Sequence, residues 1–168
     1  MRECKSEKVR KCESAKVREC RVREWGGGGA YAGGVMHQSE RVLAEVLGPV
    51  HMQMRRAEAA YRSYLDDRKF IYTLVLRDSN TAVRDLLLER GYLLPTDLQD
   101  DALQLIQHLD IWLVKWHDMR ARTNPSLDDP FVLANESVYP KRSAQNLEAM
   151  YATVAGAERA AGRSVDAA

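Results

Sequence analysis

The sequence predicts an all-α fold: a helical bundle of about five helices, with two long antiparallel helices and a small extended or hairpin insertion before the last one. From residue 39 onward, apolar residues recur at steps of three and four, the spacing that places them on one helix face. Proline, glycine and short polar residues, which begin and end helices, separate these stretches. The length of 168 residues, 45% of them hydrophobic, suits one globular domain.

The first two helices follow from this spacing. Ser39 precedes an apolar face that ends at Gly48-Pro49, where we expect the first helix to break or kink because proline lacks a backbone N–H. A longer second helix is predicted over residues 50–77. Its apolar stripe contains Met54, Ala57, Tyr61, Tyr64 or Leu65, Ile71 or Tyr72, and Val75.

The third and fourth helices are separated by clear boundary residues. The polar residues 78–80 offer a cap for a short third helix over residues 81–90, and Gly91 should stop it. Pro95-Thr96-Asp97 opens the fourth helix, which should run for about 24 residues and pair with the second. Its apolar stripe contains Leu98, Ala102, Leu105, Leu109, Trp112, Trp116 and Met119.

A loop and a last helix complete the predicted domain, which spans residues 36–162. Asn124-Pro125 marks the start of the loop, because the residue before proline avoids helical geometry. Within it, residues 131–133 and 137–139 could pair as a small hairpin or lie extended over the bundle. Ser143 caps the last helix, and residues 163–168 are expected to be disordered.

Residues 1–35 are predicted to form a disordered, low-complexity tail. Cys4, Cys12 and Cys20 open three copies of one octapeptide, and a glycine-rich stretch follows them. Zinc sites use ligand pairs two to four residues apart, so this spacing does not predict one. Two interpretations remain open: translated repetitive DNA upstream of a start codon at Met36, or a genuine basic tail that contacts RNA or a protein partner.

The charges are divided unevenly along the chain. Residues 1–24 contain nine basic and five acidic side chains, whereas the remainder contains 16 basic and 19 acidic ones. Outside the tail there is therefore no overall basic excess of the kind that nucleic-acid binding requires. The sequence contains neither a membrane-spanning apolar run nor a recognisable secretory signal, so we expect a cytoplasmic protein with no membrane association.

No residue pattern predicts a catalytic or metal site. The helical dimetal motif Glu-x-x-His and the zinc motif His-Glu-x-x-His are both absent, so we expect no metal and no cofactor. His117 lies seven residues after Asp110, about 10.5 Å along a helix, which is too far for a direct hydrogen bond. Trp112 and Trp116 are expected to belong to the core.

The leading functional prediction is a non-enzymatic helical interaction subunit or adaptor that binds a protein partner or forms a homo-oligomer. The apolar face of the fourth helix is wider than one neighbour covers, which leaves a partner-binding surface. We predict that it contains Leu103, Ile106, Leu113, Phe131 and Tyr139.

The alternative prediction is a nucleic-acid-associated accessory protein or a cryptic helical nuclease. It depends on a row of cations along the second helix, formed by Arg55, Arg56, Arg62 and Lys69. Acidic residues four positions away predict ion pairs within this row. Unpaired cations in the folded protein would favour the alternative, and exposed apolar surface would favour the interaction role.

Overall fold

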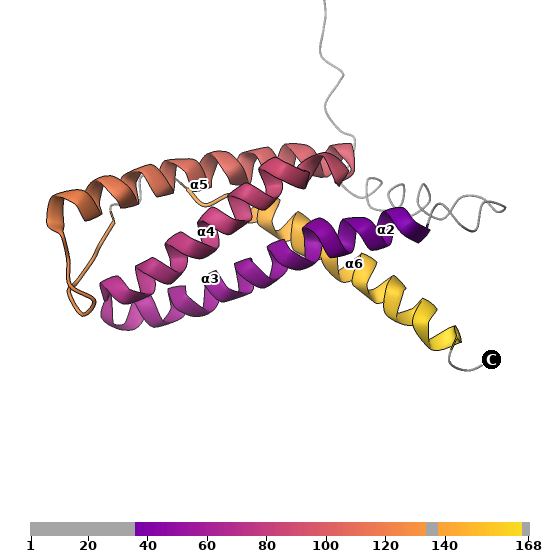
Figure 1. Ribbon diagram of the computed structural model, residues 1–168, viewed down its shortest axis with the longest axis horizontal. Coiled ribbons are helices and arrows are strands. Elements are labelled where there is room, and N and C mark those ends of the chain that lie inside the picture. The colour runs from indigo at the N-terminus through magenta and orange to yellow at the C-terminus, as the bar shows by residue number, and fades with distance from the viewer. Residues whose placement is uncertain (1–35, 134–137, 166–168) are drawn as a thin grey trace, which may run out of the picture. The chain divides into compact units, whose positions relative to one another are not determined.

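The structure, a computed structural model, describes residues 36–133 and 138–165 (Figure 1). The predicted tail, residues 1–35, lies outside the described residues. The elements in chain order are α2 (Met36–Val42), the π-helical turn η1 (Leu43–Leu47), α3 (Gly48–Asp67), α4 (Phe70–Arg90), the 3₁₀ turn η2 (Gly91–Leu93), α5 (Thr96–Thr123) and α6 (Lys141–Val165). No strand occurs within the described ranges, which confirms the all-α prediction.

The predicted break at Gly48-Pro49 is wrong, because the backbone stays helical from α2 through η1 into α3. Leu47 and Gly48 both have right-handed helical torsions, and the N–H of Gly48 donates to the carbonyl of Leu43, five residues earlier. This wider π-helical turn adapts the helix to a proline, whose ring would crowd a regular α-helical turn. A Cβ at Gly48 would lie 2.8 Å from the Leu43 oxygen, so glycine fits this turn closely.

The predicted helix over residues 50–77 is in fact divided between α3 and α4. Arg68 has a left-handed conformation with φ of 58°, Lys69 is extended, and the Asp67 carboxylate accepts a hydrogen bond from the Lys69 N–H at 3.2 Å. Residues 78–80 consequently cap no separate helix, because α4 continues through them to Arg90. The structure agrees with three predicted boundaries. Helices α4 and α5 end before Gly91 and Asn124, and the predicted fourth helix, α5, starts at Thr96.

Helix α4 lies between α3 and α5 and packs against both, and α6 packs against α5 and η1 (Figure 1). Short connections join α3 to α4 and α4 to α5, so these three long helices alternate in direction. One apolar cluster joins all of these elements. Its buried members include Val46, Val50, Val83, Leu87, Leu98, Leu105, Leu109, Leu147 and Val154. Among the described residues, no helix combines the length and apolar character needed to cross a bilayer.

A second, aromatic cluster lies where the loop after α5 returns to the junction of α3 and α4. Phe131 is fully buried, with its ring 5.0 Å from that of Phe70 and 5.9 Å from that of Trp116. The Tyr64 hydroxyl donates to the Phe131 carbonyl at 3.0 Å. In the same loop, the Asp129 carbonyl accepts a hydrogen bond at 2.9 Å from the N–H of Phe70, the first residue of α4. The loop therefore closes one end of the core and caps the start of α4.

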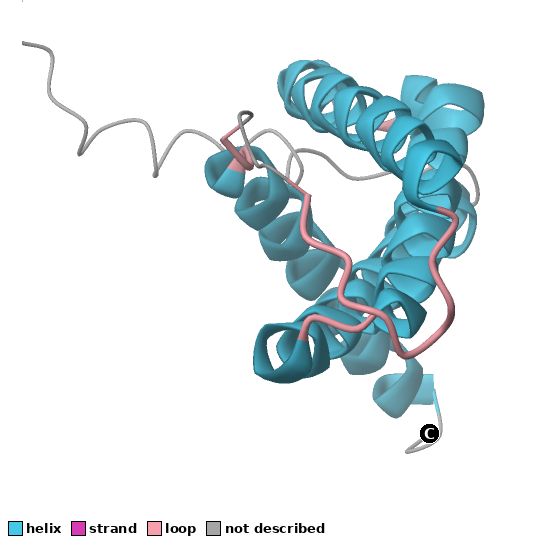
Figure 2. Cartoon of the chain, turned by 90° about the vertical axis from the view of Figure 1, so that its left-hand side faces the viewer, coloured by secondary structure: helices cyan, strands magenta, loops and turns pink. Residues whose placement is uncertain are grey.

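The predicted insertion is a loop in the part of the chain that the structure describes, as Figure 2 shows. Residues 131–133 and 138–139 form no strand, and residues 134–137 lie outside the described residues. An isolated antiparallel bridge joins Lys69 to Pro130. Helix α6 extends to Val165, three residues past the predicted end of the domain.

Candidate functional site

The structure divides the predicted partner-binding residues between the interior and the surface. Ile106, Leu113 and Phe131 are buried within the chain itself. Leu103 and Tyr139 are exposed, with 59% and 39% of their surfaces accessible. The three buried residues offer nothing to a partner, because α4, α6 and the loop cover more of α5 than its sequence indicates.

Three aliphatic side chains are exposed on one side of α5. Leu103, Ile111 and Val114 are 59%, 39% and 69% exposed. At 100° per residue they lie within one arc, together with Gln107, and opposite the buried Leu98 and Trp116. We call these four exposed residues, Leu103, Gln107, Ile111 and Val114, the outer face of α5. It points away from the contacts that α5 makes with α4 and α6.

Sequence reasoning named Leu103 but missed Ile111 and Val114, although a signal was present. Residues 111–114 are four consecutive apolar residues in the middle of a helix. Four residues span about 300° of the helix circumference, so they cannot all face one core. Leu113 is buried and Trp112 packs against the aromatic cluster, which leaves the other two outside.

The charges of α5 are segregated along its length. The segment before Ile111 contains Asp97, Asp100, Asp101 and Asp110 and no cation, whereas the segment after it contains Lys115, Asp118, Arg120 and Arg122. Arg84 of α4 lies 3.5 Å from the Asp110 carboxylate, and Arg122 pairs with Asp118 at 2.7 Å. The outer face of α5 thus lies between an acidic end and a mostly basic end.

Each of the predicted nucleic-acid-binding cations has a partner within the protein. Arg55 and Arg62 both pair with Glu58, the former at 2.8 Å. Lys69 lies 3.2 Å from the Asp128 carboxylate, and the hydrogen bond to Asp128 raises the pKa of Lys69. Arg56 donates to the hydroxyl of the buried Ser79 at 3.4 Å. The row of cations is therefore largely neutralised on its own surface.

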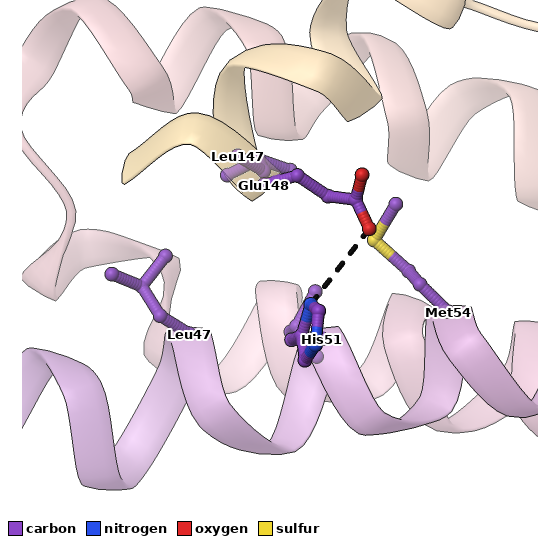
Figure 3. A pocket seen from close by; sticks show the side chains of 6 residues that line it. Leu47, His51, Met54, Leu147 and Glu148 are labelled. Atoms are coloured by element: carbon purple, nitrogen blue, oxygen red, sulfur yellow. Dashed lines mark ion pairs between the residues drawn. The ribbon is translucent and has the colours of Figure 1, made fainter. Parts of the chain in front are cut away.

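A shallow hollow lies between α3 and α6 (Figure 3). His51 and Glu148 face each other across it, with 3.7 Å between the His51 Nδ1 and a carboxylate oxygen. The His51 ring also stacks on Tyr151, with a centroid distance of 4.0 Å. Leu47, Val50, Met54 and Leu147 complete the lining, so the polar pair has apolar neighbours.

This hollow combines a histidine and a carboxylate, the residue types of a general base. However, the space between its side chains is too narrow to enclose a water molecule. The distance of 3.7 Å also exceeds that of a good hydrogen bond. The arrangement is therefore suited to holding α6 against α3, by the stacking of His51 on Tyr151 and by the apolar side chains around it.

A second ring pair lies at the start of α6. Tyr139 meets the buried His108 edge-on, with a centroid distance of 5.3 Å. Burial lowers the pKa of His108, because water no longer solvates the imidazolium. Burial and then the charge of Glu148 raise the pKa of Tyr139. No group of three or more potential metal-ligating side chains was found among the described residues.

Comparisons with protein-family models, with curated proteins and with solved structures gave no match for this chain.

Proposed function

We propose that this chain is a non-enzymatic helical interaction subunit that binds a protein chain through the outer face of α5. The observation that carries the proposal is the exposure of Leu103, Ile111 and Val114 on one side of a helix whose opposite side is fully packed. Removing such aliphatic surface from water is favourable by roughly 25 cal/mol per Å². A docking helix or strand would supply that cover.

The proposal is also supported by the polar residues around the aliphatic ones. Gln104 and Gln107 can form hydrogen bonds with a partner at the edge of the apolar surface, and the charged ends of α5 can orient it. Gln104 already accepts a hydrogen bond from Ser143 of α6 at 3.1 Å, which keeps this edge of the surface ordered.

A nucleic-acid role through Arg55, Arg56, Arg62 and Lys69 has weaker support. Phosphate binding gains affinity when cations replace the counterions of the nucleic acid. Here Glu58, Asp67 and Asp128 already compensate three of these cations. To reach these cations, a phosphate backbone would have to displace the three carboxylates, and their negative charge would repel it.

The test is affinity capture from the source cells with the full chain, followed by identification of the bound protein and reconstitution with that purified partner. Val114→Asp places a charge at the most exposed aliphatic position of the outer face of α5 and should abolish binding. Met52→Asp is the matched control, because Met52 is similarly exposed but lies on α3, and it should bind normally. A partner that binds the Val114→Asp chain with unchanged affinity would contradict the proposal.

A further inference from the structure

We infer that the chain docking on the outer face of α5 is a second copy of this protein, with the two α5 helices antiparallel and centred on Ile111. This inference rests on the proposed function and specifies its partner. The argument comes from the charges at the two ends of α5 and from the positions of its exposed aliphatic residues.

The charge distribution selects the orientation of the two helices. The first half of α5, up to Asp110, carries four aspartates and no lysine or arginine. The second half carries Lys115, Arg122 and Asp118, and also Arg120, which lies over the Phe70 ring on the core side, 5.7 Å from its centroid. A parallel pair would therefore bring two acidic halves together, which is repulsive. An antiparallel pair brings each acidic half against the partner's mostly basic half.

The spacing of individual residues matches this orientation. Asp100 lies eleven residues before Ile111 and Arg122 eleven residues after it, which places each about 16 Å from the centre along the helix axis. In an antiparallel pair centred on Ile111, each Asp100 would thus lie level with the other copy's Arg122. The Arg122 guanidinium pairs with Asp118 of its own helix at 2.7 Å and would be shared between the two carboxylates. Both residues lie on the same flank of the outer face of α5, so twofold symmetry brings them to the same side.

The apolar residues fit the same register. Ile111 would meet its own symmetry mate at the twofold axis. Val114 would lie about 1.5 Å along the axis from the level of Gln107, and Leu103 about 3 Å from the level of Ala121, a small exposed residue that leaves room for the leucine. Each exposed aliphatic side chain would therefore gain a partner.

The size of this surface sets the expected strength of the dimer. A single pair of helices buries less surface than the roughly 1,200–2,000 Å² of a standard stable interface. We therefore expect a dimer with a dissociation constant in the micromolar range rather than a permanent one.

Sedimentation equilibrium of the full chain between about 1 and 200 μM should show a reversible monomer–dimer equilibrium. Asp100→Lys and Arg122→Glu should each weaken the dimer by about tenfold, because twofold symmetry makes each change act at two ion pairs. The chain with both substitutions should recover most of the affinity, since the pairs are restored with reversed charges. Val114→Asp should give a monomer throughout.

Two results would overturn the inference: a strict monomer at 200 μM, or a doubly substituted chain that dimerises no better than the single variants. Met52→Asp should leave the dimer unchanged, and melting curves of all variants should show that they remain folded. A strict monomer whose captured partner is still lost on Val114→Asp would contradict the second copy alone. A monomer without any partner sensitive to Val114→Asp would contradict the proposed function as well.

Discussion

Replacement of Phe131 by alanine tests whether the loop after α5 is a necessary part of the core. The ring is fully buried between Phe70 and Trp116, and the backbone around it forms hydrogen bonds with Arg68 and Tyr64. Truncation of a buried phenylalanine costs about 3–5 kcal/mol. Because a loop can shift inward more easily than a helix, we expect a loss near 3 kcal/mol in the free energy of unfolding.

Urea denaturation followed by far-ultraviolet circular dichroism measures this loss, which should lower the midpoint without changing the slope. In a protein of this size it corresponds to a fall of about 6–12 °C in Tm. Val132→Ala is the control, since that side chain is 55% exposed and should cost less than about 0.5 kcal/mol. A loss below 1 kcal/mol for Phe131→Ala would refute the conclusion that the loop closes the core.

Three further predictions follow from other parts of the molecule. Gly48→Ala should destabilise the fold by about 1 kcal/mol or more, because its Cβ would lie 2.8 Å from the Leu43 oxygen. Gly156→Ala should instead stabilise the fold by about 0.5–1 kcal/mol, since a Cβ there meets nothing within 4 Å. Thermal melts of the two variants test both expectations. Burial lowers the pKa of His108, so the unfolded chain takes up a proton that the folded protein resists, and stability should fall as the pH drops below about 6.5. Urea titrations across pH 5–8 should show this loss, and His108→Gln should reduce it. Lys69→Ala should leave any affinity for a short DNA or RNA duplex unchanged, because Asp128 already compensates the Lys69 charge. Fluorescence anisotropy measures this affinity, and a clear drop would favour the nucleic-acid role.

Helix boundaries were predictable where the residues at the boundary determine them. Asn124 accepts a left-handed conformation readily and precedes a proline, so α5 ends where the sequence indicates. The break at Arg68 has no such residue, and arginine is uncommon in the left-handed conformation that it adopts there. That break depends on the distant loop, whose Asp129 and Leu127 carbonyls accept the first N–H groups of α4. Only the Asp67 side chain, which accepts the Lys69 N–H, gave a local signal.

Gly48-Pro49 illustrates the opposite error, in which a strong local signal is overridden. Proline normally ends a helix because it lacks an N–H and crowds the preceding turn. Here Val46, Leu47 and Val50 all belong to the main core, so a break would remove three buried side chains from it. One π-helical turn keeps all three in place. Tertiary packing therefore determines the outcome.

The candidate site was only partly predictable, because exposure depends on neighbours that the sequence does not position. Leu103 and Ile106 are aliphatic residues three positions apart on the same amphipathic helix and look alike in sequence. The structure buries Ile106 in the main core and leaves Leu103 exposed. The cations of α3 were easier to interpret, since their pairing with Glu58 follows from helical spacing alone.

Folding and docking can be separated on α5 because they use opposite sides of the same helix. Leu98, Leu105 and Trp116 belong to the two core clusters, and none of the four residues of the outer face of α5 does. Exposed positions of this kind usually change stability by less than about 0.5 kcal/mol when substituted. A polar residue at Val114 should consequently remove association and leave the melting curve almost unchanged. Loss of both together would show that the outer face of α5 contributes to the fold itself.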